Sequence, residues 1–227
     1  MNVPTVCCTV WGDKAPQWER WMVKSLKQGY PNARYERITP DLLAMQAMYG
    51  NLAHRMTSGH CKSLAYRMFG GPDGPVWVVD ADLLFLRPLS WTPKSPDTIL
   101  AAAPGGDPKY LEFAREVGFE PVDNVTINAG VLWLNGDLYP LWSKWQEPVL
   151  KIMHESPYPQ SECIFNIIWH ELRKEGKAEA LPVSYNQIIS EHGPYGATIF
   201  HLAGSPEHFR ATLMESYYKA LCNPEAV

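Results

Sequence analysis

Two kinds of hydrophobic pattern alternate along this chain. Short apolar runs, such as VWVV at 76–79, are typical of strands, and longer segments with apolar residues three or four positions apart are typical of helices. The predicted strands are 3–11, 33–38, 76–80, 98–103, 125–134 (or two strands bent near its middle) and 197–202, and the predicted helices are 15–29, 40–49, 58–69, 137–153, 161–175 and 206–221. Because strands and helices alternate, we predict an α/β fold with one mostly parallel sheet flanked by helices. No linker rich enough to split the chain is present, so residues 1–227 are expected to form a single domain.

The composition narrows the classes of function. Hydrophobic residues make up 46% and charged residues 19% of the 227 residues, as expected for a folded globular chain. The net charge of −4 predicts no strong nucleic-acid footprint, the apolar runs are far shorter than a membrane span, and the first residues lack the pattern of a signal peptide. The cysteines are odd in number and form no CxxC motif, which indicates free thiols in a reducing, cytoplasmic setting and argues against a zinc site: Cys7, Cys8, Cys61, Cys163 and Cys222.

Two acidic residues follow the most apolar predicted strand. Asp80 and Asp82 come directly after 76–79, where burial of a carboxylate costs free energy unless a cation or hydrogen-bond donors compensate. Paired carboxylate oxygens at the carboxyl end of a parallel strand suit Mg²⁺ or Mn²⁺ that carries phosphates. A D-x-D triplet is short, and an Asp-rich turn after a strand is the alternative interpretation.

Three further segments extend this pattern in a fixed order. They are INAGV at 127–131, SECIFN at 161–166, which opens a predicted helix, and IFHLAG at 199–204. Together with the D-x-D triplet they resemble the nucleotide-sugar glycosyltransferases of the A-type fold, and most closely the retaining family that includes glycogenin and the bacterial lipopolysaccharide galactosyltransferases. The resemblance covers most of the chain, from the first strand to about residue 209, and implies a single Rossmann-like sheet.

The resemblance implies a metal site. Asp80 and Asp82 match the two acids that bind Mn²⁺ (or Mg²⁺) in this family, and His201 of the H-x-x-G motif matches the third protein ligand. Two carboxylates and one imidazole leave coordination positions open for phosphate oxygens. Taken alone, His201 is better explained as a core histidine at the end of a strand, and the D-x-D triplet and Gly204 favour the metal ligand.

The resemblance also implies contacts to the donor. Asn128 matches the family asparagine that contacts the donor sugar, although an Asn before Ala-Gly also suits a tight turn. Lys62, with Arg67 as the competing candidate, lies on the helix where the family places a basic residue near donor phosphate or sugar. Trp11 is a candidate for stacking on the base or for burial in the core. The other expected donor-binding residues come from the first loop, the D-x-D triplet and the H-x-x-G motif: Thr9, Asp80, Ala81 and Gly204.

Glu162 departs from the glycogenin-like pattern. It is a carboxylate where that family has glutamine, and its spacing to Asn166 matches the related retaining blood-group-type transferases. By these resemblances Glu162 is a candidate catalytic residue, together with Asn128. It would act as a nucleophile or stabiliser of a sugar cation, or as the general base of an inverting enzyme. The alternative is an acid that the helix dipole favours at a helix N-terminus.

A second departure concerns the diphosphate. Glu207 stands where the family motif H-x-x-G-x-x-K-P-W has the lysine that contacts it, and a glutamate there would repel phosphate. His208, Arg210 or Lys62 are the candidates to replace that lysine; otherwise metal and backbone N–H groups hold the pyrophosphate.

The combined interpretation is a metal-dependent glycosyltransferase that uses a nucleotide diphosphate sugar, with a UDP-sugar and retention of configuration favoured. The acceptor stays open among a saccharide, a lipid-linked glycan, a protein side chain and a modified nucleobase. One alternative is a nucleotidyltransferase of related fold, although TVWGDKAPQ at 9–17 is a poor version of its Gly-rich loop. The other is a non-catalytic nucleotide- or glycan-binding protein, which the missing lysine would favour.

Overall fold

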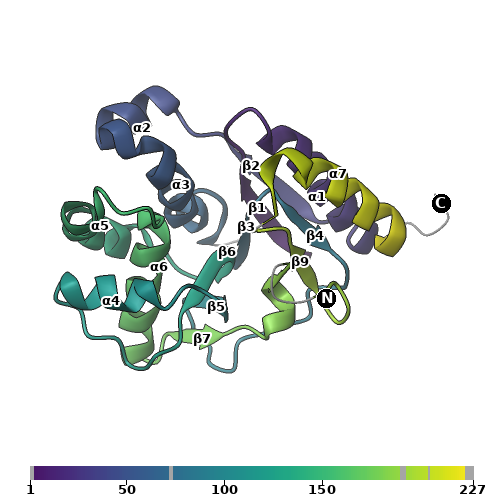
Figure 1. Cartoon of the computed structure of the whole chain (residues 1–227). Helices are drawn as coiled ribbons and strands as arrows, with labels where there is room; N and C mark the ends of the chain where they lie inside the picture. The colour runs from purple at the N-terminus through teal and green to yellow at the C-terminus, as the bar shows by residue number, and fades with distance from the viewer. Residues whose placement is uncertain (1–2, 72–73, 190–192, 204, 223–227) are drawn as a thin grey trace.

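The buried apolar runs form a six-stranded sheet with strand order β2-β1-β3-β6-β5-β7. The computed structural model describes residues 3–71, 74–189, 193–203 and 205–222 (Figure 1). The strands of this sheet are β1 (Thr5–Thr9), β2 (Arg34–Ile38), β3 (Val76–Val79), β5 (Leu100–Pro104), β6 (Ile127–Leu134) and β7 (Ala178–Ala180). β6 runs antiparallel to its neighbours β3 and β5, and the other three pairs are parallel. The expected α/β fold is confirmed, with a sheet that is mixed.

Helices cover both faces of the sheet. They are α1 (Ala15–Gly29), α2 (Leu42–Tyr49), α3 (Ala53–Phe69), α4 (Lys109–Glu116), α5 (Tyr139–Met153), α6 (Gln160–Lys174) and α7 (Glu207–Tyr217). One hydrophobic core joins the sheet to α2 through α6, and a second core joins the opposite face to α1 and α7 (Figure 1). Among the described residues, no helix is both long and apolar enough to cross a membrane.

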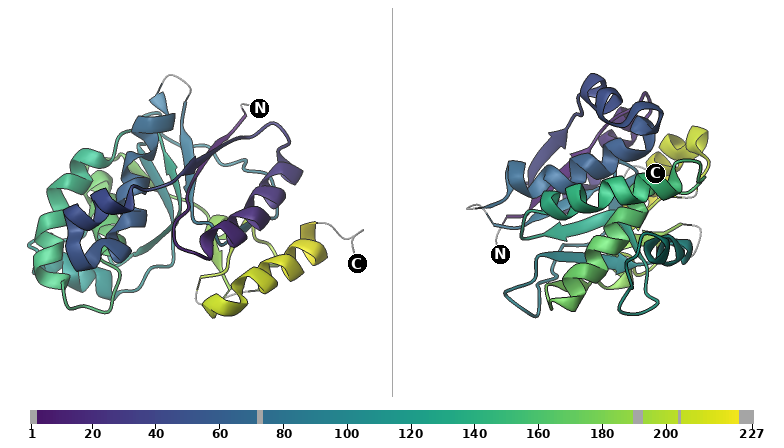
Figure 2. Two further views of the ribbon diagram at one scale, coloured as in Figure 1. Left: turned by 90° about the horizontal axis from the view of Figure 1, so that it is seen from above. Right: turned by 90° about the vertical axis from the view of Figure 1, so that its left-hand side faces the viewer.

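A second, three-stranded sheet lies on the α1 and α7 side. It contains β4 (Leu83–Phe85), β8 (Gln187–Ile188) and β9 (Ile199–His201), in the order β4-β9-β8. β4 pairs antiparallel with β9, so that Leu83 lies opposite His201. This pairing brings the segment after the D-x-D triplet against the late H-x-x-G segment, and Figure 2 shows the small sheet from two further directions.

The two faces of β1 separate the two cores. Cys7 packs in the core under α2 through α6, and its neighbour Cys8 packs in the core under α1. This is the alternation expected of adjacent residues in a strand. All five cysteines are buried and unpaired, and burial raises the pKa of the Cys7 thiol to about 12.

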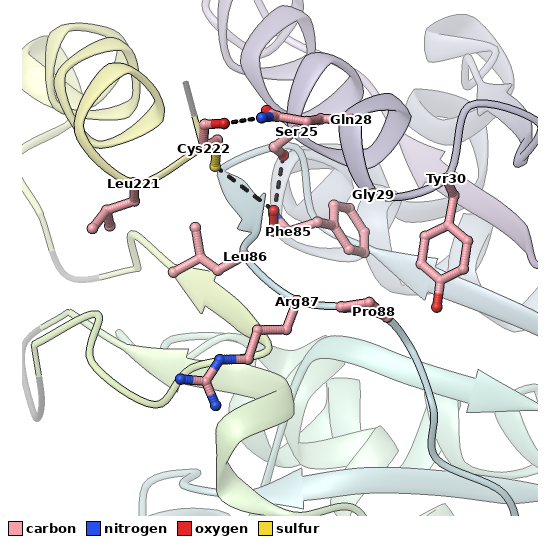
Figure 3. Close-up of a pocket in the computed structure, with 10 residues that line it drawn as sticks. All are labelled: Ser25, Gln28, Gly29, Tyr30, Phe85, Leu86, Arg87, Pro88, Leu221 and Cys222. Carbon is pink, nitrogen blue, oxygen red and sulfur yellow. Dashed lines mark hydrogen bonds between the residues drawn. The ribbon is translucent and has the colours of Figure 1, made fainter. Parts of the chain in front are cut away.

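The C-terminal segment is fastened to α1 and β4. The side chain of Gln28 donates a hydrogen bond to the carbonyl of Cys222, and the Cys222 thiol faces the carbonyl of Phe85 at 3.8 Å. Ser25 accepts a hydrogen bond from the Phe85 N–H at 3.0 Å. These contacts border a hollow of about 160 Å³ (Figure 3). They hold α7 beside α1 and thereby fix the position of the side chains that α7 presents.

Candidate functional site

The candidate site lies at one edge of the main sheet, where three strand ends meet. β1 and β3 are parallel neighbours, so Thr9 and Asp80 leave the sheet at the same edge. β6 is antiparallel to β3 and therefore begins at that edge, where the Asp80 N–H donates to the carbonyl of Gly130 at 2.9 Å. β1 lies between β2 and β3, which are the next two strands of this sheet along the chain, so the strand order reverses direction at β1. Open α/β sheets bind ligands at such a switch point, beyond the carboxyl ends of the strands.

Asp80, Asp82 and His201 converge there, as the sequence predicted. The Nε2 atom of His201 lies 3.3 Å from Oδ1 of Asp82 and 3.9 Å from Oδ2 of Asp80. One ligand atom from each residue lies within 4.8 Å of the other two. The register of β4 and β9 explains this arrangement, because it places His201 opposite Leu83 and lets the Leu202 N–H donate to the Asp82 carbonyl at 3.0 Å.

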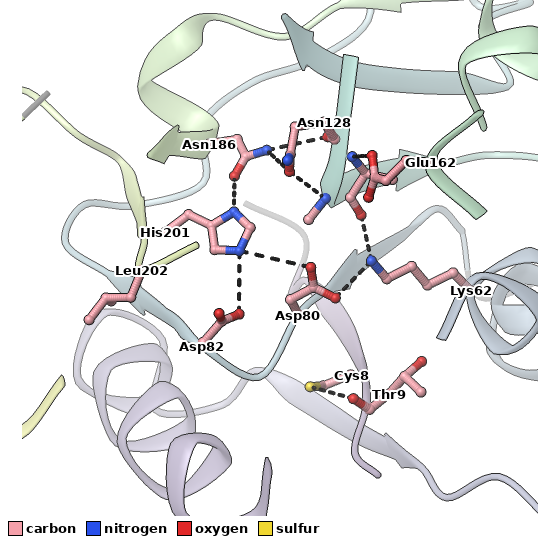
Figure 4. A network of polar contacts seen from close by, with 12 residues as sticks. Cys8, Thr9, Lys62, Asp80, Asp82, Asn128, Glu162, Asn186, His201 and Leu202 are labelled. Atoms are coloured by element: carbon pink, nitrogen blue, oxygen red, sulfur yellow. Dashed lines mark hydrogen bonds and ion pairs between the residues drawn. The ribbon is translucent and has the colours of Figure 1, made fainter. Parts of the chain in front are cut away.

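A chain of amide hydrogen bonds fixes the orientation of the His201 ring (Figure 4). The Gly130 N–H donates to Oδ1 of Asn128 at 2.8 Å, and that oxygen also accepts from Nδ2 of Asn186 at 2.8 Å. Oδ1 of Asn186 therefore faces Nδ1 of His201, at 2.8 Å, and accepts a hydrogen bond from the Nδ1–H group. Because Nδ1 carries the proton in the neutral ring, Nε2 presents a lone pair toward the two carboxylates.

Gly130 makes room for this ring. A Cβ atom at Gly130 would lie 2.3 Å from Cε1 and 2.7 Å from Nδ1 of His201. Both distances are shorter than any ordinary contact, so a glycine is needed for His201 to pack against β6. From the sequence, the N-A-G motif indicated a function only for Asn128, because the contact of its glycine with His201 depends on the folded chain.

Asp82 and His201 are both buried, and each shifts the pKa of the other. Burial by itself lowers the pKa of His201, but the carboxylate of Asp82 outweighs it and raises that pKa above its ordinary value. Burial likewise acts to raise the pKa of Asp82, and the charge and hydrogen bond of His201 lower it overall. Asp82 is therefore held as a carboxylate, the form that a cation requires.

Lys62 lies on the other side of Asp80 and is almost fully buried. Its ammonium group is 2.7 Å from Oδ1 of Asp80 and donates to the carbonyl of Ala129 at 2.7 Å. Burial would lower the pKa of Lys62, but Asp80 and Glu162 more than compensate and raise it. Lys62 thus stays charged and orients Asp80 from behind; its rival Arg67 pairs with Asp137 elsewhere.

Glu162 stands in the first turn of α6 and faces the start of β6. Its Oε2 atom accepts a hydrogen bond from the Ala129 N–H at 3.0 Å, on the strand that Lys62 contacts. Burial raises the pKa of Glu162, and the nearby Lys62 opposes that rise. Asn166, one turn later, binds both backbone groups of Ile127 and so holds α6 against β6. Asn166 therefore has a structural function here.

A hollow of about 200 Å³ opens beside the carboxylates. The expected donor-binding residues Thr9, Trp11, Asp80 and Ala81 line it, together with Ala15, Trp18, Ser58, Asp82 and Arg210. The hydroxyl of Thr9 is buried and has no hydrogen-bond partner among the described residues. Gly204 lies outside the described residues.

Arg210 reaches this hollow from α7. Its Nη1 atom is 2.7 Å from Oδ2 of Asp82, and its guanidinium lies 4.8 Å from the ring centre of Trp18. The Asp82 carboxylate thus faces His201 with one oxygen and Arg210 with the other. The sequence named Arg210 as one of three possible cations but gave no reason to choose it, because the choice depends on the packing of α7.

The donor set fits a divalent ion. Ligand atoms that each lie about 2.1 Å from one octahedral ion are roughly 3.0 Å apart in cis positions and roughly 4.2 Å apart in trans positions. The distances from Nε2 of His201 to the carboxylate oxygens of Asp82 and Asp80, 3.3 Å and 3.9 Å, fall within this range, and all three ligand atoms lie within 4.8 Å of one another. Two carboxylate oxygens and one oriented imidazole nitrogen are ligands that a divalent ion accepts.

Comparison with solved structures finds the same architecture. The chain is similar to the galactosyltransferase LgtC in complex with donor and acceptor sugar analogues, with a TM-score of 0.65, 13% identity, and coverage of 93% of this chain and 95% of that chain. A glycosyltransferase involved in glycosylation of the major capsid of PBCV-1 has a TM-score of 0.57 at 16% identity, covering 94% and 99%. Mouse xyloside xylosyltransferase 1 has a TM-score of 0.53 at 13% identity, covering 91% and 99%.

Comparison by sequence finds no match, in contrast to comparison by structure. No protein-family model matches the chain, and no curated protein matches it. One matched structure is an active-site mutant of LgtC in which a glutamine is replaced by glutamate. At these low identities the likeness establishes the architecture, and it does so over nearly the whole chain: this protein has the fold of the A-type glycosyltransferases.

Proposed function

We propose that this protein transfers a sugar from a nucleoside diphosphate sugar, with a UDP-sugar favoured, to an acceptor, with retention of anomeric configuration. The observation that carries the proposal is the convergence of Asp80, Asp82 and an oriented His201 at the ligand-binding edge of a glycosyltransferase fold. Mn²⁺, or Mg²⁺, held by these three residues would supply a Lewis acid that stabilises the negative charge of the departing diphosphate.

Different residues near the hollow are proposed to contact different parts of the donor. The unpartnered hydroxyl of Thr9 and the ring of Trp11 are proposed to hold the nucleoside, because both line the hollow beside Asp80. Lys62 holds the Asp80 carboxylate in place from behind through their 2.7 Å ion pair. Asn186 links Asn128 to His201, because its side chain hydrogen-bonds to both. We propose that Asn128 faces the donor sugar.

Glu162 is the proposed catalytic carboxylate. It is held on the Ala129 N–H, and Asp80 binds the Lys62 ammonium that contacts the carbonyl of the same Ala129. Burial raises the pKa of Glu162, and a carboxylate with a raised pKa is a stronger base when ionised. It would stabilise or attack the sugar cation that forms as the diphosphate leaves, or act as the general base if the product is inverted.

The first experiment tests metal-dependent donor binding. Calorimetry with UDP and Mn²⁺ should show binding to the parent protein that is lost in Asp82→Ala and kept in the control Asp137→Ala, whose carboxylate pairs with Arg67 away from the site. UDP-sugar hydrolysis without acceptor should follow the same order. Unchanged UDP affinity in Asp82→Ala would contradict the proposal, and release of pyrophosphate from UTP and a sugar phosphate would favour the nucleotidyltransferase alternative.

The second experiment tests Glu162. In Glu162→Gln the amide oxygen can still accept the Ala129 N–H, so donor and metal binding should persist while kcat falls by about 100-fold or more. This is the reverse of the exchange present in the matched LgtC mutant. Parent-level turnover with the same product anomer would remove Glu162 from the mechanism, and an inverted parent product would make Glu162 a general base and retention wrong.

The acceptor class and compartment complete the proposal. A saccharide, a lipid-linked glycan, a protein side chain and a modified nucleobase are the candidate acceptors. Five buried, unpaired thiols support a reducing compartment such as the cytoplasm.

A further inference from the structure

One cation at the site has no assigned function. Arg210 is anchored at four points: Oδ2 of Asp82 at 2.7 Å, the carbonyl of Ser205 at 2.8 Å, the hydroxyl of Ser205 at 3.3 Å, and the ring of Trp18. Its side chain is only 16% exposed, yet it lines the hollow of about 200 Å³. The contacts therefore hold a guanidinium in a fixed position at the wall of a ligand-sized space.

The other two cations that the sequence offered for the diphosphate have different contacts. Lys62 is 3% exposed, and its ammonium is committed to Asp80 and to the carbonyl of Ala129. His208 contacts the ring of Phe209 in a tilted pair at the exposed start of α7. Arg210 lies one helical turn after Glu207, which turns to Lys14 at 3.8 Å. Long side chains on a helix lean toward its N-terminus, which brings Arg210 back over the position that Glu207 leaves.

The charges around the hollow show what Arg210 would respond to. The carboxylates of Asp80, Asp82 and Glu162 face the cations of Lys62 and Arg210. A divalent ion added to this set leaves one net positive charge, with Arg210 on the hollow side of Asp82. Arg210 repels the divalent ion when that ion binds alone. When a diphosphate lies between them, Arg210 and the divalent ion both attract it.

We propose that Arg210 binds the diphosphate of the nucleotide and couples nucleotide binding to metal binding. Its charge disfavours a divalent ion bound alone at Asp82 and favours the same ion bound together with a nucleoside diphosphate. The guanidinium has N–H groups beyond those used by Asp82 and Ser205, so it can donate to phosphate oxygens without leaving Trp18. This proposal rests on the proposed function, because it takes the ligand of the hollow to be a nucleoside diphosphate.

The test measures two affinities that should move in opposite directions. In Arg210→Gln, Mn²⁺ alone, titrated by electron paramagnetic resonance, should bind roughly twofold to fivefold more tightly because a nearby positive charge is gone. At saturating Mn²⁺, UDP measured by calorimetry should bind about tenfold more weakly or worse, because a charge-assisted contact is lost. Uridine affinity should not change.

Controls separate coupling from damage to the fold. Arg20→Gln removes the same charge from α1, where Arg20 lies over Trp21, and should leave both affinities at the parent values. Arg210→Lys keeps the charge without the planar fork and should restore metal affinity fully but UDP affinity only in part. Thermal unfolding should be cooperative in every variant.

The outcomes distinguish this proposal from the proposed function. If the parent binds UDP with Mn²⁺ but Arg210→Gln binds it equally well, the coupling is wrong and the proposed function stands. If Arg210→Gln weakens Mn²⁺ binding as well as UDP binding, Arg210 only supports the fold of the site. If the parent binds none of UDP, GDP, ADP and CDP with Mn²⁺, the proposed function fails and Arg210 has no diphosphate to bind.

Discussion

The substitution Gly130→Ala tests the geometry of the site with a single methyl group. The added Cβ would lie 2.3 Å from Cε1 of His201, whereas carbon atoms in contact are about 3.5 Å apart, so the ring must withdraw by roughly 1 Å. Metal–ligand distances tolerate only about 0.2 Å. The same movement strains the 2.8 Å hydrogen bond from His201 to Asn186. Loss of such an orienting partner typically lowers metal affinity by about 10-fold to 100-fold.

The assay is Mn²⁺ titration of the parent, Gly130→Ala and two comparison variants. Gly29→Ala is the matched control, because a Cβ at the end of α1 would meet nothing within 4 Å. Asn186→Ala removes the tether of the ring without a clash and should also lose about 10-fold or more in metal affinity. Thermal unfolding identifies a variant that fails to fold. A folded Gly130→Ala protein that binds Mn²⁺ with the parent affinity would refute the assignment of His201 as a ligand fixed by its packing on β6.

Three further predictions address the core and the buried groups. Lys62→Met should lower the free energy of unfolding by about 1–3 kcal/mol in urea titrations, because the carbonyl of Ala129 loses its donor in a buried site; an unchanged midpoint would mean that water replaces the ammonium. Burial lowers the pKa of His170 below 6.5, and its Nδ1 accepts from the Val122 N–H at 3.3 Å. The unfolded chain therefore takes up a proton first as the pH falls through about 6.5, and stability drops until the pH passes the folded-state pKa; urea titrations of His170→Gln at pH 7.5 and 5.5 should lack this part of the loss. Mass spectrometry after alkylation in denaturant should count five free thiols, whereas native protein should react slowly because burial raises the pKa of thiols such as Cys7, and a disulfide in fresh protein would contradict the reducing compartment.

Much of the fold could be predicted because its long elements have strong periodicity. The helix predicted at 15–29 is α1 with the same bounds, and the apolar run that ends at Asp80 is β3. The elements that were missed are short: β4, β7 and β8 have three residues or fewer, and α4 has eight. Strand direction was also missed, because the apolar pattern of β6 is the same whether it runs parallel or antiparallel to β3.

The candidate site was predictable where its residues are adjacent in sequence or carry a motif. Asp80, Asp82 and His201 were expected together, and the structure brings them together. Asn186 was missed, because a buried asparagine in a 3₁₀ turn gains its function only when β9 places His201 beside it. Which cation faces the hollow was likewise undecidable from spacing, since burial of Lys62 and the docking of α7 decide it.

The pairing of β4 with β9 has a consequence for biosynthesis. β4 is an apolar strand, and within the described chain its ladder partner is β9, more than 110 residues later. At a synthesis rate of about 5–20 residues per second, on the order of ten seconds pass on the ribosome before that partner emerges. During this interval Leu83, Leu84 and Phe85, which are buried in the folded protein, present a strand edge without its partner. The edge of the sheet that carries the candidate site therefore cannot be completed before β9 has emerged, and the yield of native protein should depend on what shields β4 until then.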